Sequence, residues 1–312
     1  MLGDEQVAQG WMTLRRTSIA RRSFVGNGAY VADGCHIPED ALIGVLGRLD
    51  EGVPLRQGET WLGSPAVRLP ARETLTGYPE SLTFHPTPWR RVARGLIEAL
   101  RIVLPTGFTV AAGCAIAEAL VPLWQQGAWL QLLGETLLAG SAFALASFLV
   151  VLGLKWLVVG RYRPRSAPMW TFFVWRSEAI TSLYETLAVP NLLGTLRGTP
   201  WLPLALRLLG ARLGRGTYLD TTDLTEFDCV RLGDHGELNA LAGPQTHLFE
   251  DRVMKVGEVE LGKGVNLGPR SVVLYGARVG DDVELGPLSL VMKGETLPGR
   301  SRWEGNPVQP RR

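Results

Sequence analysis

One histidine, His247, stands among charged residues that suit acid–base chemistry. Glu250, Asp251 and Arg252 follow it within five positions. Imidazole is the side chain that most often moves protons near neutral pH, and a neighbouring carboxylate can orient its ring. The sequence therefore predicts His247 as a base and Glu250 as its catalytic partner, with Asp251 orienting the ring or holding an ammonium group. Arg252 is a candidate anchor for a carboxylate or a phosphate.

An irregular stretch upstream supplies second-rank candidates. Glu226 and Asp228 form an acidic pair there, and Asn239 follows in the chain. Negative and amide groups of this kind can bind a cationic amine, so we predict a substrate-binding role for these three residues. The alternative for each acidic residue is a solvated or structural role. For His247 the alternative is a hydrogen bond that fixes the surrounding segment.

Metal binding has little support in the sequence. His235 and His247 are twelve residues apart and Cys229 is a lone thiol, which is a poor ligand set for zinc. The chain also has no phosphate-binding loop, serine-nucleophile motif or paired CxxC. We therefore expect neither a metal nor a cofactor bound by this chain.

An aliphatic residue recurs at every sixth position in both flanks of the chain. The first run is Ile19, Val25, Val31, Ile37 and Ile43, and the longer second run extends from Leu261 to Leu297. A fixed period of six predicts parallel β-helices, in which three hexapeptides form one triangular coil with the aliphatic residues inside. Residues 243–256 break the period, and such breaks project from one face and often carry function.

Two adjacent apolar runs separate these flanks. Residues 102–124 are long enough to cross a hydrocarbon core of about 30 Å as a helix, and a second candidate span, residues 128–159, contains an uncharged apolar stretch at 136–154. Arginines and lysines border the pair and are missing from the short connector, which predicts cytoplasmic flanks. We expect a multi-pass protein of the cell's inner (plasma) membrane, and the alternative is a buried hairpin of a soluble protein.

Composition agrees with a folded protein of this kind. The 312 residues are 46% hydrophobic and 20% charged, with a net charge of +2. Disorder, collagen and a disulfide scaffold are excluded, and the charge gives no reason to expect nucleic-acid binding. The three cysteines suit a reducing compartment.

These observations divide the chain into four segments. Residues 1–80 form a partial β-helix, 90–160 the helical hairpin, 161–210 an amphipathic, aromatic-rich interfacial connector, and 211–312 a second β-helix. The two flanks end alike, since Gly58–Ala66 resembles Gly294–Thr296 followed by Trp303–Val308. The first copy shows five hexapeptides, fewer than two coils, so we expect this chain to be the C-terminal piece of a longer polypeptide.

The hexapeptide pattern and the closing Gly305-Asn306-Pro307 resemble the left-handed β-helix acyltransferases. A closer resemblance is carried by RSEAITSLYETL from Arg176, QTHLFEDRVMK from Gln245, SVVLYGA and LGPLSLVMKGE. These segments are similar to the C-terminal region of ε-poly-lysine synthetase-like nonribosomal peptide synthetases, and the similarity covers nearly the whole chain.

This resemblance implies a membrane-tethered acyltransferase-like terminal module that forms amide or isopeptide bonds between activated amino acids. The donor would be a thioester on a phosphopantetheine carrier or on acyl-CoA. Expected partners are the bilayer, adenylation and carrier domains on the same or another polypeptide, and sister β-helices in a trimer or pseudo-trimer. The alternatives are an acyl-CoA-dependent hexapeptide-repeat acetyltransferase and a non-catalytic scaffold or export module.

Overall fold

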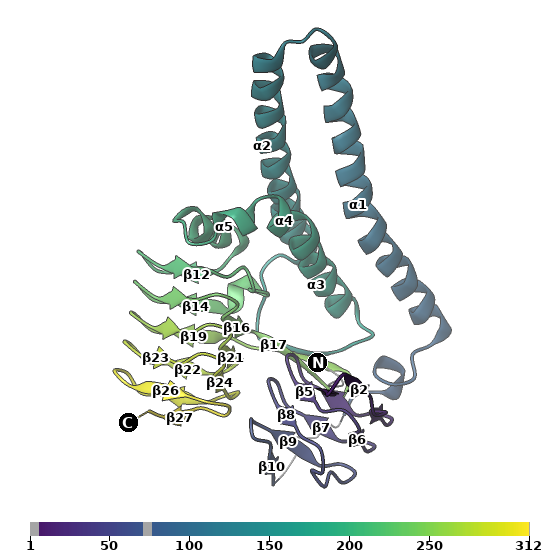
Figure 1. The fold of residues 1–312 in the computed structure, drawn as a ribbon, viewed down its shortest axis with the longest axis vertical. Coiled ribbons are helices and arrows are strands. Elements are labelled where there is room, and N and C mark those ends of the chain that lie inside the picture. Colours follow the sequence, from purple (N-terminus) through teal and green to yellow (C-terminus); the bar gives the residue numbers. More distant parts are fainter. Residues whose placement is uncertain (1–5, 71–76, 312) are drawn as a thin grey trace.

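Two triangular β-helical prisms lie beside each other, and a long helical hairpin rises from them (Figure 1). The computed structural model describes residues 6–70 and 77–311. Along the chain the order is first prism, hairpin, helical connector and second prism.

The second prism stacks short parallel strands on three faces. Its first face contains β12 (Arg212–Leu213), β14 (Val230–Leu232), β19 (Val259–Leu261), β22 (Arg278–Val279) and β25 (Thr296–Leu297). Its second face contains β13 (Tyr218–Leu219), β15 (Glu237–Leu238), β20 (Asn266–Leu267), β23 (Glu284–Leu285), β26 (Arg302–Glu304) and the antiparallel β27 (Gln309–Pro310). Its third face contains β16 (Gly243–Gln245), β21 (Val272–Leu274) and β24 (Leu290–Val291). The period-six side chains Leu267, Val273 and Val291 are fully buried along the axis.

The first prism is built in the same way. Its faces are β3 (Ser18–Ile19) with β6 (His36–Ile37), β4 (Phe24–Val25) with β7 (Leu42–Ile43) and β9 (Thr60–Leu62), and β5 (Tyr30–Val31) with β8 (Arg48–Leu49). Strand β10 (Val67–Leu69) pairs antiparallel with β9. The expectation of fewer than two coils is wrong, because Leu49, Leu55 and Trp61 keep the spacing of six and extend the prism into a third coil.

The predicted fold class is therefore confirmed: left-handed parallel β-helix domains joined by a two-helix hairpin. Helix α1 (Pro88–Gln125) and helix α2 (Trp129–Leu154), which continues as a π-helical turn Lys155–Val159, are both long and apolar enough to cross a membrane. At 1.5 Å per residue, the 38 residues of α1 extend over about 57 Å. Side chains such as Leu130 and Leu133 are exposed along the hairpin.

A connector of short helices covers the open end of the second prism. It comprises β11 (Arg165–Pro168), α3 (Phe172–Leu183), a π-helical turn Tyr184–Ala188, α4 (Val189–Asn191), a 3-10 turn Leu193–Leu196 and α5 (Trp201–Leu209). Leu202, Leu206 and Leu209 of α5 are fully buried against the first coil. Trp175 of α3 is also buried, so α3 packs within the protein, and Gly210 ends α5 in a left-handed conformation.

The two prisms are copies of one unit in an unbroken register. Each residue of the first has its counterpart 242 positions later, so Ile19 corresponds to Leu261 and Trp61 to Trp303. The left-handed turn residues coincide as well: Leu46 matches Leu288. The hairpin β1 (Gln6–Ala8) and β2 (Trp11–Thr13) matches β17 (His247–Glu250) and β18 (Val253–Val256), with the same pairing register.

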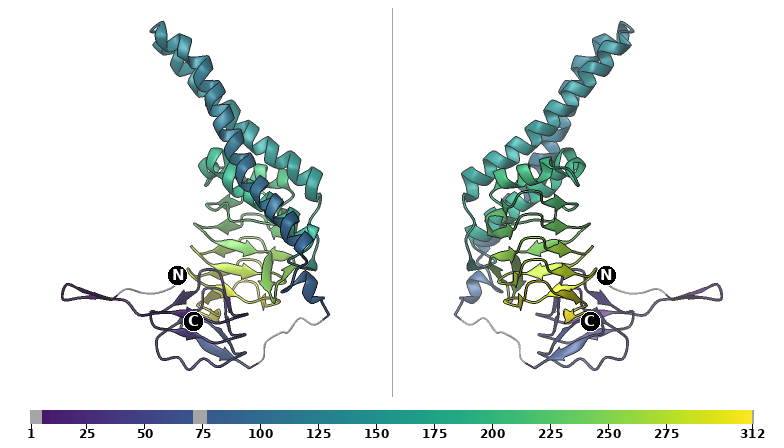
Figure 2. Two further views of the ribbon diagram at one scale, coloured as in Figure 1. Left: turned by 90° about the vertical axis from the view of Figure 1, so that its right-hand side faces the viewer. Right: turned by 90° about the vertical axis from the view of Figure 1, so that its left-hand side faces the viewer.

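The prisms contact each other through unlike sides. Val45 and Leu62 of the first pack with Leu274 and Leu290 of the second. Asn306 reinforces this seam, because its Nδ2 donates to the Leu46 carbonyl at 2.8 Å and its own carbonyl accepts from the Ser64 N–H at 3.1 Å. Figure 2 shows the first prism beside the last coils of the second, away from the tip of the helical hairpin.

Candidate active site: a histidine–glutamate pair between the prisms

Two segments that interrupt the coils, here called excursions, project from the second prism and contact each other at its side. One is the irregular segment 220–229, which ends in the 3-10 turn Phe227–Cys229, and the other is the hairpin β17–β18. The predicted break at 243–256 is wrong at its start, because residues 243–245 form β16 and pair with β21 within the prism. His247 is the first residue of the excursion, and its Nδ1 lies 2.7 Å from Oε2 of Glu226.

Glu226 is held in place from several directions. Its side chain is completely buried, and the Ser177 hydroxyl of α3 donates to Oε1 at 3.1 Å. The Thr246 hydroxyl lies 2.7 Å from Oε2. The backbone of Glu226 adopts a left-handed conformation (φ 39°), which is unusual for a residue with a side chain and is common at functional sites.

Glu226 determines which nitrogen of His247 carries the proton, and each group shifts the pKa of the other. Burial alone lowers the pKa of His247, but the charge and hydrogen bond of Glu226 outweigh it and raise the pKa above the usual value of about 6.5. Burial likewise opposes ionisation of Glu226, yet His247 and Thr246 hold the pKa of Glu226 below its ordinary range. An ionised carboxylate only accepts hydrogen bonds, so Nδ1 of His247 donates and Nε2 is left as the basic nitrogen.

His247 lies where two cavities meet. The larger, with a volume of about 580 Å³, runs between the prisms and is lined by Asn27 and Leu46 of the first prism and by Arg270 and Leu288 of the second. The smaller, of about 220 Å³, lies under α1 and α3. The imidazole is 19% exposed, and its Nε2 has no hydrogen-bond partner among the described residues.

Acidic side chains surround this junction. Glu185 lines both cavities, and Asp223 lines the larger one. Both side chains are exposed. Arg270 is the cation that lines the larger cavity from the second prism. A compound entering between the prisms would therefore meet Arg270 at one part of the cleft and carboxylates next to His247.

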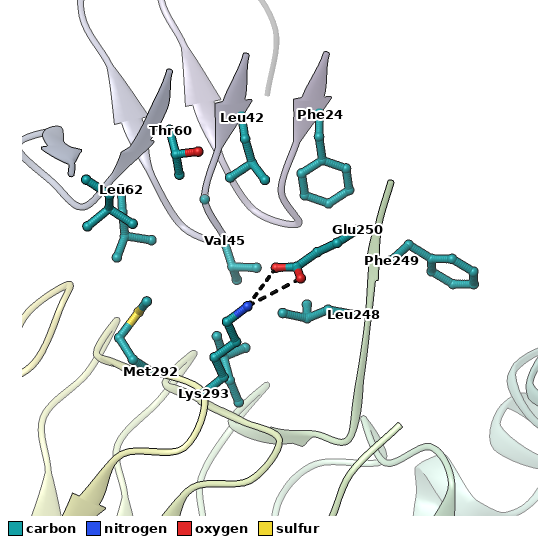
Figure 3. A pocket seen from close by; sticks show the side chains of 13 residues that line it. Phe24, Leu42, Val45, Thr60, Leu62, Leu248, Phe249, Glu250, Met292 and Lys293 are labelled. Atoms are coloured by element: carbon teal, nitrogen blue, oxygen red, sulfur yellow. Dashed lines mark hydrogen bonds and ion pairs between the residues drawn. The ribbon is translucent and has the colours of Figure 1, made fainter. Parts of the chain in front are cut away.

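The predicted catalytic partner Glu250 lies elsewhere. Its carboxylate accepts from Lys255 at 2.8 Å and from Lys293 at 3.2 Å, and Figure 3 shows it pointing toward Lys293 across an apolar cavity of about 200 Å³ between the prisms. Alternate residues of a strand face opposite sides, so Leu248 and Glu250 face away from His247. The expectation that Glu250 or Asp251 orients the imidazole is corrected: Glu226 does so.

Asp228 and Asn239 are also engaged in structural contacts. Asp228 forms a buried ion pair with Lys155, with Nζ and Oδ2 2.8 Å apart. The Asn239 amide donates to Asn266 at 3.0 Å on the prism side. Neither residue lines the cleft, because strand and loop geometry place both at other points of the prism.

Asp251 and Arg252 form the turn of the β17–β18 hairpin in left-handed conformations. The Arg252 guanidinium contacts the Met169 sulfur at 3.5 Å and lies near the Phe84 ring. Arg252 is absent from the residues lining the cleft, since it lies at the far end of β17 from His247.

Four further residues of the candidate site were not predicted from the sequence: Ser177, Glu185, Asp223 and Arg270. Arg270 occupies a left-handed corner of a coil, at the position matched by Gly28, but Arg22 and Arg300 occupy similar corners, so this pattern alone did not identify it. The others lie on segments outside the repeat. Among residues 6–70 and 77–311, no group of three His, Cys, Asp or Glu side chains is placed to hold a metal ion.

Two hexapeptide prisms with a histidine in the cleft between them define a hexapeptide-repeat β-helix protein. Solved structures similar to parts of the chain include a maltose O-acetyltransferase from Clostridium difficile 630 (20% identity, 36% of this chain and 73% of that one, TM-score 0.30). Another is a hexapeptide-repeat acetyltransferase from Vibrio cholerae (14% identity, 40% and 87%, TM-score 0.32). No protein-family model matches the chain.

A sequence relative is more similar. The chain is 52% identical over 310 residues, 99% of its length, to a delta-poly-L-ornithine synthetase of Acinetobacter baumannii (strain AB307-0294). It spans 23% of the length of that relative. The chain is thus homologous along its whole length to one segment of that synthetase, which supports the predicted family resemblance.

Proposed function

We propose that this chain is an acyltransferase module that forms amide bonds between an activated amino acid and an amine, as a terminal part of a nonribosomal peptide synthetase. The observation that carries the proposal is the His247–Glu226 pair at the junction of two cavities. A buried carboxylate that fixes one imidazole nitrogen and leaves the other toward a cleft is the arrangement of a general base.

The reaction follows from this geometry. The amine nitrogen of the acceptor attacks the thioester carbonyl, a C–N bond forms, and Nε2 of His247 takes the proton from that nitrogen. The C–S bond then breaks, and the imidazolium returns the proton to the leaving thiolate. Glu226 stabilises the imidazolium throughout by its hydrogen bond to Nδ1.

The donor thioester enters between the prisms in this proposal. A phosphopantetheine arm, on a carrier domain or in acyl-CoA, is long, narrow and ends in a phosphate. The larger cavity follows the seam between the prisms, and Arg270 is positioned to bind that phosphate.

The acceptor is a cationic amino acid or its polymer. Such a compound keeps a second ammonium group while one amine reacts, and Glu185 and Asp223 offer it carboxylates beside His247. The relative's name, a poly-ornithine synthetase, agrees with a cationic product. In this proposal adenylation and carrier partners supply the activated residue. The apolar length of the two hairpin helices and the Arg and Lys residues at their borders support a location in the inner membrane with both prisms cytoplasmic.

The test uses the chain in lipid nanodiscs with an ornithinyl thioester of N-acetylcysteamine or of coenzyme A and free ornithine as acceptor. Mass spectrometry measures the dipeptide amide. We expect His247→Ala to lower its formation about 10²–10⁴-fold, the usual contribution of a general base. His235→Ala is the matched control, because His235 is exposed on a coil turn of the same prism. Unchanged amide formation in His247→Ala would refute the proposal, and turnover of acetyl-CoA alone would favour an acetyltransferase.

A further inference from the structure

Helix α5 has apolar side chains on two opposite faces. Its inner face is buried against the first coil of the second prism. Trp201, Leu204 and Leu208 lie on the outer face, at spacings of three and four residues, and are 62%, 47% and 50% exposed. A helix that is apolar nearly all round is normally buried in a protein core or in a membrane.

The inner end of α2 extends this outer face. Trp156 and Leu157 of the π-helical turn are 45% and 82% exposed. The Trp156 indole N–H donates to the Leu208 carbonyl at 2.9 Å, so the turn and α5 lie at the same level of the molecule. Figure 1 shows α5 above β12, at the end of the second prism that faces the helical hairpin. We call the five exposed residues Trp156, Leu157, Trp201, Leu204 and Leu208 the α5 surface.

The length of α2 places the α5 surface at the depth of a bilayer boundary. Trp129 begins α2 at the far end of the hairpin, where its ring packs on Trp124. From Trp129 to Trp156 the helix rises about 40 Å at 1.5 Å per residue. A bilayer with its headgroup regions is about 40–45 Å thick, and tryptophan is enriched at both of its boundaries. When Trp129 lies at the outer boundary, the α5 surface therefore lies in the inner headgroup region.

The charges around α5 suit lipid phosphates. Residues 186–219 contain four arginines and no acidic residue. Arg197, Arg207 and Arg212 are exposed on α5 or close to its ends. Arginine side chains at a membrane interface extend their guanidinium groups toward phosphate and keep their methylene groups in the apolar layer. A bilayer surface supplies both the apolar layer and the anionic groups that this combination requires.

We propose that α5 lies in the inner headgroup region of the bilayer, with its inner face on the prism and its outer face in contact with lipid. This inference rests on the proposed membrane location of the helical hairpin. The α5 surface is then a second membrane contact besides the two spanning helices. It holds the capped end of the second prism against the bilayer, and the coils from β12 to β26 stack away from the membrane (Figure 1).

The test measures quenching of a fluorophore by nitroxide-labelled lipids in nanodiscs of phosphatidylethanolamine and phosphatidylglycerol. The fluorophore is attached to Leu204→Cys in a Cys114→Ala background, because the other cysteines, Cys35 and Cys229, are buried. We expect nitroxides in the headgroup region to quench this position at least threefold more strongly than Leu288→Cys. Leu288 is the matched control, because it is an exposed leucine in the last coils of the same prism.

A third position, Leu133→Cys within α2, separates this inference from the proposed membrane location. Nitroxides on the acyl chains should quench it, and a failure to do so would overturn both proposals. Quenching at Leu133→Cys, with Leu204→Cys quenched only by aqueous iodide, would show that the hairpin is in the bilayer and α5 is outside it. Protection of Leu204→Cys from both quenchers would also overturn the inference, since a protein segment would then cover the α5 surface.

Discussion

His247 can accept a proton only when its imidazole is neutral, and Glu226 controls that state. The carboxylate fixes the proton on Nδ1 and stabilises the charged ring once Nε2 has been protonated. The same interaction raises the pKa of His247. The imidazole is therefore a stronger base, but a smaller fraction of His247 is neutral at pH 6–7.

The rate of amide formation should therefore depend on pH in a predictable direction. The deprotonated imidazole is the active form, so kcat/KM rises with pH through the raised pKa of His247, with a midpoint above about 6.5. Glu226→Gln removes the charge that raises this pKa, so the midpoint moves to lower pH while the maximal rate falls. A pH–rate profile of both proteins measures this shift, and a midpoint that stays in place in Glu226→Gln would separate Glu226 from the titrating base.

Arg270 lines the larger cavity and is the cation proposed to bind the donor phosphate. Replacing it with alanine should raise the KM for a coenzyme A thioester about tenfold, because a charge-assisted hydrogen bond to phosphate contributes about 1.5–3 kcal/mol. The N-acetylcysteamine thioester has no phosphate, so its KM should not change. Arg300→Ala is the control, since Arg300 is an exposed corner arginine outside the cleft. An equal effect on both donors would contradict the phosphate role.

The sequence predicted that a histidine and a carboxylate form this site, but not that His247 pairs with Glu226. His247 and Glu226 both stood out as polar residues in breaks of the repeat. They are 21 positions apart on separate excursions, so spacing favoured the nearer Glu250. Only the coil geometry brings the two excursions to one side of the prism and turns Glu250 to the other side of β17.

The loop that carries Glu226 is connected to the helical hairpin by a buried ion pair. Asp228, two residues after Glu226, is paired with Lys155 at the inner end of α2, and Oδ2 also accepts from the Tyr162 N–H at 3.1 Å. Lys155 is fully buried. The C-terminal end of α2 therefore supports the loop that carries Glu226 of the candidate active site.

Breaking this ion pair should be costly. Lys155→Met leaves the Asp228 carboxylate buried without its cation, which destabilises a protein by about 3–5 kcal/mol. The double variant Lys155→Met/Asp228→Asn should recover part of this loss, because no buried charge remains. Thermal unfolding in nanodiscs measures both. Arg302→Met, which breaks the exposed pair with Glu284, should cost no more than about 1 kcal/mol. Equal stability of the Lys155 and Arg302 variants would argue against the anchoring role.

The elements themselves were predictable to different degrees. Period six located the prism strands, and apolar length located α1 and α2, because both patterns depend on local sequence. Strand β11 was not foreseen, since it contains Pro168 and pairs with β18 at a distance of about ninety residues. Tertiary packing determines that β11 pairs with β18, and a local sequence pattern does not show such a pairing.

The two prisms differ in sequence at the candidate site and at the seam between them. In the 242-residue register the position of His247 corresponds to Glu5, which lies outside the described residues, so the first copy has no histidine there. The seam has diverged as well: Val45 and Leu62 of the first prism match Pro287 and Glu304 of the second. The sequence revealed two copies, but not that their unlike sides meet, because the seam residues differ between the copies: Leu274 and Leu290 of the second prism match Ala32 and Arg48 of the first.

This divergence predicts one active site for the pair, with the first prism as its second wall. Val45→Asp places a charge in the buried seam, where Val45 is 5% exposed, and should open the cleft that Asn27 and Leu46 help to line. We expect amide formation to fall at least tenfold while circular dichroism still reports two folded prisms. Glu5→Ala, at the position matching His247, should leave the rate unchanged. Loss of activity in Glu5→Ala, or full activity in Val45→Asp with the seam demonstrably opened, would instead indicate two prisms that work independently.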